Sequence, residues 1–302
     1  MIDIVILGSA AGGGVPQWNC GCPNCRDART SHPDLSATQT SIAFSGDGRH
    51  WFLINASPDL RHQLAQTPAL HPAPGELRHS PIAGVVLTNG EIDAITGLLT
   101  LREGTSFTLY AHERVMGILE ANPIFNALKP GTVERRPITL DTPFALSLPG
   151  GEEAGITITA FAAPGKTALF LEDTDENQPG DTLGLKITDQ SDGRSFIFLA
   201  ACAEVNDDVR GYLERAELVF FDGTLWRDDE LIDQGLSQKT GQRMGHISMQ
   251  KAMDELDTLN IERKIFLHIN NSNPALRSDS VERQRVEAAG WQILADGTEL
   301  RL

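Results

Sequence analysis

Ten short runs of β-branched and aromatic residues dominate the chain and constrain its fold more than any other feature. Three end in Gly and one in Asn, which is typical of buried strands that lead into loops. The runs cover residues 2–8, 41–46, 50–56, 82–88, 106–112, 155–163, 183–188, 195–201, 217–223 and 264–270. We therefore expect a large β-sheet core.

Four segments between these runs have the apolar spacing of amphipathic helices. They cover residues 57–67, 112–121, 206–216 and 247–259. Strand runs dominate early, and strands alternate with helices after the middle of the chain. This order favours an α/β (α+β) arrangement of two sheets covered by helices over a three-layer dinucleotide-binding fold. With 302 residues and no internal repeat, the chain is expected to form one domain over residues 1–302.

Charge and cysteine content narrow the classes of protein to consider. The net charge of −16 argues against binding a nucleic-acid backbone, which favours basic surfaces. No stretch approaches the roughly 20 apolar residues of a membrane span, and the opening MIDIVILG lacks the positive region of a signal peptide. Four cysteines, three of them close together, do not resemble a disulfide framework. These features predict a cytoplasmic protein without membrane insertion.

The most unusual segment is LGSAAGGGVPQWNCGCPNCRD, residues 7–27, which places Cys20, Cys22 and Cys25 in a Cys-x-Cys-x-x-Cys pattern. A dinucleotide cradle is disfavoured, because the glycines lead into Pro16 and not into a helix. Three sulfurs in such a turn can instead converge on one Zn²⁺. We expect this zinc to be structural, because a site closed by four protein ligands leaves no position for a substrate.

A structural zinc usually takes its fourth ligand from another Cys or His. The candidates are Cys202, His246 and His268. We favour His246, because it lies on a Gly-flanked turn directly before a predicted helix. Three reduced cysteines without a metal are the alternative, and a disulfide between such close neighbours is less favoured.

Six motifs occur in order along the chain, and together they resemble the pyrroloquinoline quinone (PQQ) biosynthesis protein B family. They are LGSAAGGGVPQWNCGCPNC, NASPD, TNGEIDAITGLLTLREG, DGTLWRDDE, MGHISM and LHINNSNP. The resemblance covers essentially the whole chain. It implies a metallo-β-lactamase-like fold, an αββα sandwich of two mixed sheets flanked by helices. Phosphodiesterases of this superfamily bind a structural zinc through a similar cysteine loop and a later histidine, which implies Cys20, Cys22, Cys25 and His246 as ligands here.

The resemblance also locates a catalytic region that lacks most of the expected metal ligands. Hydrolases of the superfamily use His-x-His-x-Asp-His to bind two metals that activate a hydroxide. The matching stretch, TNGEIDAITG, has Asn89, Glu91, Asp93 and Ala94 at these positions, so only the aspartate is retained. Among the later ligands, His268 in LHINNSNP survives. We therefore do not expect a two-zinc hydrolase.

The remaining donors are rich in oxygen and suit a harder ion such as Fe(II), Mn(II) or Mg(II). The resemblance implies a role in PQQ biosynthesis, and the leading hypothesis is an iron-dependent hydroxylase that acts on a tyrosine-derived PQQ precursor. Its predicted catalytic residues are Glu91, Asp93 and His268. Its predicted substrate-binding residues are Asn89, Asp222, Asn270 and Asn273.

The alternative hypothesis is a non-catalytic carrier that binds PQQ or its precursor and assists its transfer to the periplasm. PQQ carries three carboxylates, so this hypothesis predicts basic residues at the pocket mouth, with Arg102, Arg227 and Arg243 as candidates. In both cases the partner is a small molecule, and a homodimer is left open. Structural roles compete with these assignments, because Asp93 could cap a helix and His268 could be a hydrogen-bonded core residue.

Overall fold

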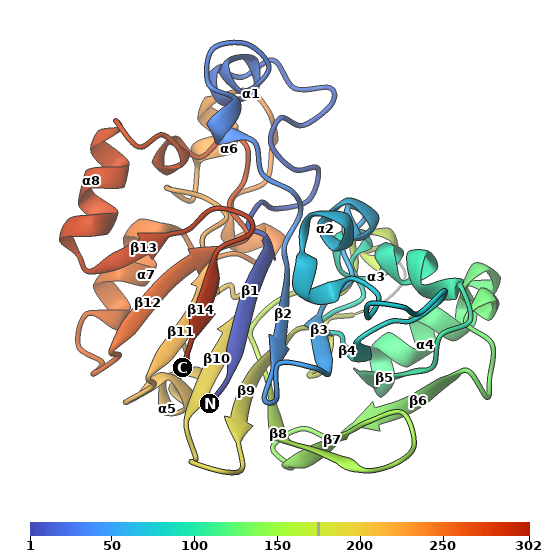
Figure 1. Cartoon of the computed structure of the whole chain (residues 1–302). Helices are drawn as coiled ribbons and strands as arrows, with labels where there is room; N and C mark the ends of the chain where they lie inside the picture. The colour runs from blue at the N-terminus through green and yellow to red at the C-terminus, as the bar shows by residue number, and fades with distance from the viewer. Residues whose placement is uncertain (174–175) are drawn as a thin grey trace.

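Two mixed β-sheets packed face to face form the centre of the computed structural model, which describes residues 1–173 and 176–302 (Figure 1). Across the first sheet the order is β14 (Glu299–Arg301), β1 (Asp3–Gly8), β2 (Ser41–Ser45), β3 (Trp51–Ile54), β4 (Ile82–Val86), β5 (Phe107–His112) and β6 (Val133–Ile138). Across the second it is β13 (Trp291–Ile293), β12 (Arg263–Leu267), β11 (Leu218–Asp222), β10 (Ser195–Leu199), β9 (Leu183–Asp189), β8 (Glu153–Ala162) and β7 (Phe144–Ser147).

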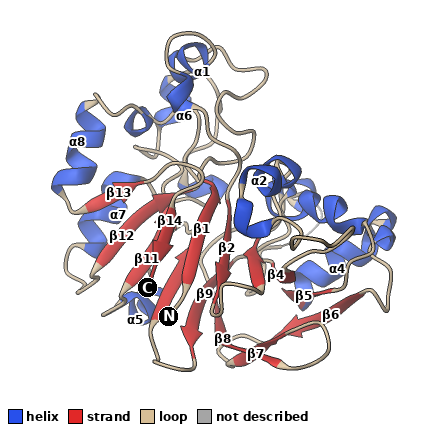
Figure 2. Ribbon diagram, viewed as in Figure 1, coloured by secondary structure: helices blue, strands red, loops and turns tan. Residues whose placement is uncertain are grey.

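Helices cover the outer face of each sheet (Figure 2). The first sheet is covered by α2 (Leu60–Gln66), α3 (Ile92–Ile95) and α4 (Glu113–Ala121), and the second by α5 (Asp207–Leu213), α7 (Met249–Leu256) and α8 (Val281–Ala288). Two shorter helices, α1 (Pro23–Ala28) and α6 (Glu230–Asp233), lie at the end of the sandwich away from the two termini (Figure 1). The predicted αββα sandwich is confirmed. Among the described helices, none has the length and apolar character needed to cross a bilayer.

The main core lies between the two sheets. Phe44 of β2 meets Phe196 of β10 edge to face, with ring centroids 5.9 Å apart, and Phe196 meets Phe220 of β11 in the same way at 5.8 Å. A second apolar layer on the outer face of each sheet packs against the helices. Because the central strands are covered on both faces, their sequences are continuous apolar runs without polar alternation.

Every predicted strand run and helix is present, but several elements were not predicted from the sequence. The additional strands are β6, β7, β13 and β14, and the additional helices are α1, α6 and α8. The unpredicted β6 is an edge strand with exposed polar side chains and Pro137, which an edge tolerates because one side of the strand needs no partner. Helix α8 buries Val286 alone among its residues, so its apolar pattern is too weak to recognise.

Candidate functional site

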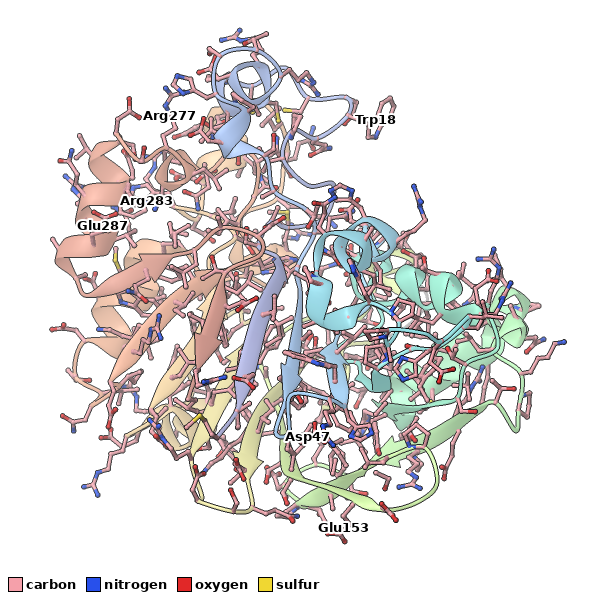
Figure 3. All side chains as sticks on the ribbon, viewed as in Figure 1. Trp18, Asp47, Glu153, Arg277, Arg283 and Glu287 are labelled. Atoms are coloured by element: carbon pink, nitrogen blue, oxygen red, sulfur yellow. The ribbon has the colours of Figure 1, made fainter. Side chains whose placement is uncertain are left out.

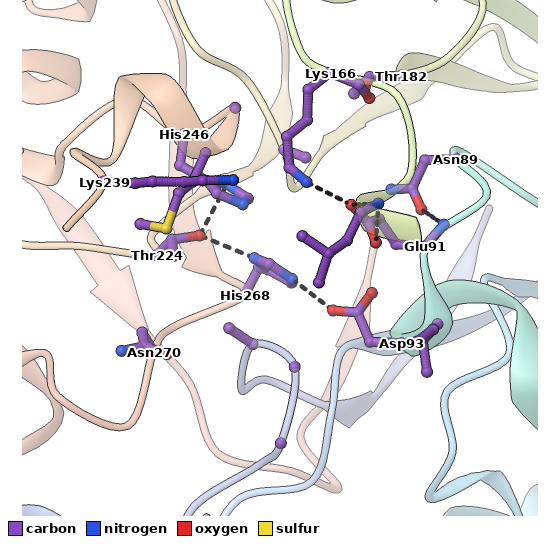
Figure 4. Close-up of a pocket in the computed structure, with 18 of the residues that line it drawn as sticks. Asn89, Glu91, Asp93, Lys166, Thr182, Thr224, Lys239, His246, His268 and Asn270 are labelled. Carbon is purple, nitrogen blue, oxygen red and sulfur yellow. Dashed lines mark hydrogen bonds and ion pairs between the residues drawn. The ribbon is translucent and has the colours of Figure 1, made fainter. Parts of the chain in front are cut away.

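The candidate site lies where the carboxyl ends of parallel strands from both sheets meet. Strands β10, β11 and β12 run parallel, so their carboxyl ends come together at one edge, with Asp222 the last residue of β11 and Cys202 and His268 just after β10 and β12. In the first sheet β4 runs parallel to β3 and β5 and leads through Asn89 into α3, which carries Asp93. A cavity of about 620 Å³ opens between these two edges (Figure 4). The carboxyl edge of a sheet with parallel strands is the usual position of a ligand site in α/β folds.

His246 and His268 lie side by side in the cavity wall, with ring centroids 5.1 Å apart and the planes 23° from parallel. His246 Nδ1 is 2.8 Å from Asp222 Oδ2, and His268 Nδ1 is 2.9 Å from Thr224 Oγ1. The Thr224 hydroxyl donates to Asp222 Oδ1 at 2.7 Å, because a carboxylate can only accept. The Thr224 oxygen therefore accepts the hydrogen bond from His268 Nδ1. Both histidines therefore carry a proton on Nδ1. In the neutral imidazoles this leaves each Nε2 available as a metal ligand.

Asp222 holds the side chains of His246 and Thr224 in place. It is fully buried and also accepts hydrogen bonds from the backbone N–H groups of Cys202 at 2.9 Å and Thr224 at 3.0 Å. All of its acceptor capacity is thus used by the protein. The prediction that Asp222 binds substrate is wrong, because the carboxylate has no access to the cavity and instead orients a histidine.

His268 and Asp93 connect the two sheets across the site. His268 Nε2 lies 3.1 Å from Asp93 Oδ2 (Figure 4). Burial raises the pKa of the Asp93 carboxyl, but the hydrogen bond and charge of His268 outweigh it and hold that pKa below its usual value. Burial likewise lowers the pKa of His268, but Asp93 outweighs it, so the net shift is upward. Asp93 does not cap α3, which has Glu91 at its N-cap.

The donor set fits a divalent ion of the harder class. Two neighbouring ligands of an octahedral ion with bonds of about 2.1 Å lie about 3 Å apart, which matches the 3.1 Å between His268 Nε2 and Asp93 Oδ2. His246 supplies a second imidazole on the same wall. Two histidines and one carboxylate facing an open cavity match the donor set of non-haem iron oxygenases.

His268 has an unusual backbone conformation for a side chain of its size. Its φ of +58° lies in the left-handed region, which costs energy for a residue other than glycine and persists where the surroundings hold it. The backbone on both sides is fixed, because Ile269 N donates to Ser9 O and Asn270 N donates to Thr224 O. This turn of the chain directs the imidazole toward Asp93.

The three cysteines form a separate cluster on the loop that follows β1. Their sulfurs lie within 4.8 Å of one another, and Arg29 holds the loop by donating to Cys20 O at 2.7 Å and Cys25 O at 3.3 Å. Trp18, at the tip of the loop, points away from the body of the protein (Figure 3) and is 87% exposed. The loop is held both by its own contacts and by the segment after β12, where Asn271 O accepts from Asn24 Nδ2 at 3.0 Å and Arg277 pairs with Asp27.

The fourth side chain at the cysteine cluster is Asn271. Its amide Nδ2 lies 3.1 Å from Cys20 Sγ and 3.3 Å from Cys25 Sγ. Burial raises the pKa of Cys22 to about 11. Burial acts in the same direction on Cys20, but hydrogen bonds from Cys22, Cys25 and Asn271 outweigh it and lower the pKa of Cys20. A site that brings three thiols together and favours the thiolate of one of them, Cys20, fits a zinc ion.

The prediction that His246 completes the cysteine cluster is wrong. His246 belongs with Asp222 and His268, whereas the cysteines form a distinct group. Its Gly-flanked turn does direct the imidazole inward, as expected, but toward the carboxyl edge of the second sheet. Sequence spacing could not distinguish the two destinations, because both lie at the same end of the sandwich.

The remaining predicted residues divide into those that face the cavity and those that do not. Asn89, Glu91 and Asn270 line it, together with Asp93 and His268. Asn273 is fully buried, and its side chain donates to Gly223 O at 3.0 Å and accepts from Ala275 N at 2.9 Å. The prediction that Asn273 binds substrate is therefore wrong, because its side-chain amide is hydrogen-bonded to backbone groups of the protein.

Glu91 is directed toward a lysine and not toward the histidines. Its Oε1 lies 2.9 Å from Lys166 Nζ, and its carboxylate also accepts from Leu169 N at 3.1 Å. Asn89 Oδ1 accepts from Glu91 N at 3.0 Å and so fixes the start of this segment. Glu91 therefore holds Lys166 and the backbone of Leu169 in place on the side of the cavity opposite the imidazoles.

Sequence reasoning missed several residues that shape the site. They are Lys166, Glu172, Thr224, Lys239 and Asn271. The lysines occur in segments without a motif, so nothing in the sequence marks them. Thr224 and Asn271 fall inside recognised motifs, DGTLW and LHINNSNP, beside residues that were chosen instead. The predicted Arg102, Arg227 and Arg243 do not line the cavity, and Arg102 and Arg227 pair with acidic residues elsewhere.

Comparison with known proteins agrees with this architecture. Residues 50–269 match the family model described as a beta-lactamase superfamily domain. The chain is 58% identical to coenzyme PQQ synthesis protein B of Bradyrhizobium diazoefficiens, with 100% of both chains covered. It is 51% identical to the protein of that name from Gluconobacter oxydans, covering 100% of this chain and 99% of that one.

Solved structures extend the comparison to three dimensions. The crystal structure of Zn²⁺-bound PqqB from Methylobacterium extorquens superimposes with a TM-score of 0.93 at 43% identity, covering 99% of this chain and 100% of that chain. A diphosphatase of the PhnP family shares the fold with a TM-score of 0.70 at 20% identity, covering 99% and 96%. The chain therefore belongs to the coenzyme PQQ synthesis protein B family, on a metallo-β-lactamase-like fold.

Proposed function

We propose that this protein acts in PQQ synthesis as an iron-dependent hydroxylase of a tyrosine-derived precursor. The observation that carries the proposal is that His246, His268 and Asp93 line the same cavity of about 620 Å³, with His268 Nε2 3.1 Å from Asp93 Oδ2 across it. The membership in a family named for PQQ synthesis supports the choice of pathway. We place the reaction in the cytoplasm, because a cluster of reduced thiols suits a reducing compartment.

Each protein group has a defined task in this proposal. Asp93, His246 and His268 would hold the ion, and Asp222 and Thr224 keep the Nδ1 proton on both imidazoles so that each Nε2 is free. When bound, the iron would supply the activation of O₂ that hydroxylation requires. Glu91 is engaged with Lys166, so we assign it to shaping the cavity and not to the metal.

The fold departs from the hydrolases of its superfamily at the residues that would bind a second metal. Asn89, Glu91 and Ala94 replace histidines of their motif, and the end of the strand where a bridging aspartate is expected offers Ala201 and Cys202. Cys202 is buried, and its Sγ lies 3.0 Å from Glu204 O. Burial raises the pKa of this thiol far above its usual range, which keeps it protonated and unsuited to bind a metal.

We further propose that the cysteine loop binds a structural zinc through Cys20, Cys22, Cys25 and Asn271. The relative from Methylobacterium extorquens was solved with bound Zn²⁺, which supports a zinc site in this family. An asparagine amide is reversible in orientation, and turning Asn271 would place its oxygen where Nδ2 faces the sulfurs. The zinc would pin the loop after β1 to the turn after β12.

The test is anaerobic reconstitution with Fe(II), followed by metal counting and a measurement of O₂-dependent turnover of the precursor. We expect turnover in the reconstituted protein and a loss of at least 100-fold in His246→Ala and His268→Ala. His62→Ala, at an exposed position on α2, is the matched control and should keep full activity. An iron-loaded protein without turnover would reject the hydroxylase and leave the carrier.

The carrier remains the second candidate because the cavity contains a pair of lysines beside apolar side chains. Ile92, Leu169 and Leu231 contribute to the lining, and Lys166 and Lys239 supply positive charge. A flat aromatic polycarboxylate suits such a cavity. Tight binding of PQQ with no chemical change under aerobic conditions would favour this function.

A further inference from the structure

Two lysines from distant segments converge on one carboxylate in the cavity wall. Lys166 follows β8, and Lys239 lies between α6 and α7. Glu172 joins them, with Oε1 2.6 Å from Lys166 Nζ and Oε2 2.5 Å from Lys239 Nζ. All three side chains line the cavity that contains His246 and His268, and Figure 4 shows Lys166 reaching toward Glu91.

We propose that Lys166 and Lys239 form the carboxylate-binding subsite of this cavity, and that Glu172 occupies it until a ligand carboxylate takes its place. The inference rests on the proposed function, because it assigns the anionic group of the substrate at the same site. The chemical class of the ligand is a small aromatic acid with more than one carboxylate.

The charges around the subsite support an exchange of one carboxylate for another. Lys166 pairs with Glu91 and shares Glu172 with Lys239, so two positive and two negative groups balance. A ligand carboxylate that displaces the Glu172 side chain preserves this balance, whereas one that adds to it leaves a net negative charge in a partly buried site. The exchange also explains how a chain of net charge −16 can admit a polyanion.

The position of Lys166 is fixed by its surroundings, whereas Glu172 is held mainly by the two lysines. Glu91 anchors the Lys166 amino group, and Gly245 makes room for its aliphatic chain. A Cβ on Gly245 would come 3.3 Å from Lys166 Cγ, and the φ of Gly245 is +91°, so another residue there would crowd the lysine. Preorganised cations with an exchangeable counter-ion are what a binding site for anions requires.

The test measures binding of PQQ, a tricarboxylate, and of its trimethyl ester to the full-length protein under anaerobic conditions. We expect Lys239→Met and Lys166→Met each to weaken PQQ binding about tenfold, the usual effect of removing one charged hydrogen-bond partner. Glu172→Gln should tighten PQQ binding about threefold to tenfold, because it removes the internal competitor. None of the three variants should change binding of the ester.

Matched controls are Glu176→Gln, nearby on the same segment, and Lys251→Met, on the exposed side of α7, and both should bind PQQ as the wild type does. Melting temperatures of all variants identify any that fail to fold, and Lys239→Met, at a half-exposed position, provides a test that does not depend on the fold. Equal affinity for PQQ and its ester, or weaker PQQ binding by Glu172→Gln, would overturn the proposal.

The outcome is separable from that of the hydroxylase proposal. Binding is measured without turnover, and His268→Ala should retain the effect of Glu172→Gln on PQQ affinity. If Fe(II)-dependent turnover is present but the lysine variants bind PQQ normally, the subsite is wrong and the hydroxylase stands. If the lysine variants behave as expected and no turnover occurs, the subsite stands and the hydroxylase is wrong.

Discussion

His246 Nδ1 donates to Asp222 Oδ2 over 2.8 Å, at the carboxyl edge of the second sheet and away from the cysteine loop. Because of this contact, we assign His246 to the candidate catalytic ion and not to the structural zinc. His246 then provides a second imidazole beside His268 and Asp93 at the candidate ion site. The candidate ion site therefore depends on a hydrogen bond between a surface turn and a buried strand end.

Removing the Thr224 hydroxyl should weaken metal binding without removing a ligand. Thr224→Val leaves Asp222 Oδ1 and His268 Nδ1 without their shared partner. We expect 10- to 100-fold lower affinity for Fe(II) or Mn(II) and a loss of about 1–3 kcal/mol of unfolding free energy. Thr224→Ser keeps the hydroxyl and is the control. Calorimetric titration measures the metal affinity, and urea unfolding measures the stability. A Thr224→Val protein with wild-type metal affinity would show that the Thr224 hydroxyl does not orient His268 for metal binding.

Metal affinity at the His268 site should increase with pH. The Asp93 interaction raises the pKa of His268 despite its burial, so the metal-free protein keeps this imidazole protonated to above its usual pKa. An incoming ion must displace that proton, and binding strengthens until the pH exceeds the raised pKa. Titrations with Mn(II) between pH 6 and pH 8 should show the increase. An affinity independent of pH over this range would mean that His268 does not bind the ion.

Zinc at the cysteine loop should depend on Cys22 and not on His246. In a His268→Ala background, which removes the second site from the count, Cys22→Ser should lose the bound zinc and lower the melting temperature. Adding His246→Ala to that background should leave the zinc content unchanged, because this imidazole is bonded to Asp222. Zinc content measured by mass spectrometry decides the matter. If His246→Ala lost the bound zinc, the fourth ligand would be His246 and not Asn271.

Restoring the superfamily histidine at position 94 should destabilise the protein. Ala94 is 2% exposed, and the cavity beside it holds only about 20 Å³. An imidazole there must push against the packed segment, which typically costs about 1–3 kcal/mol. Ala65→His, at an exposed position on α2, is the control and should be neutral. Thermal unfolding compares the two, and an Ala94→His protein as stable as the control would show that the space exists.

Much of the fold was predictable because its cause is local. The strand runs are buried on both faces, so their apolar character is continuous and easy to recognise, as in Ile4 and Phe44. Helix α7 follows the capping residue Ser248 and buries Met249 and Leu256, so its start and its buried face follow from the sequence. The edge strand β6 and the polar helix α8 escaped prediction because they bury little.

The cysteine cluster was visible in the sequence because Cys20, Cys22 and Cys25 lie within six positions, where chain connectivity alone brings the sulfurs together. The partners of the two histidines were not visible, because hydrogen bonds across strand ends depend on the register of β11 and β12. The meeting of Lys166 and Lys239 at Glu172 depends on two loops that are far apart in the sequence, one after β8 and one between α6 and α7. Sequence determined which chemistry was present, and the tertiary structure decided which groups share a site, because proximity there comes from sheet packing and not from spacing along the chain.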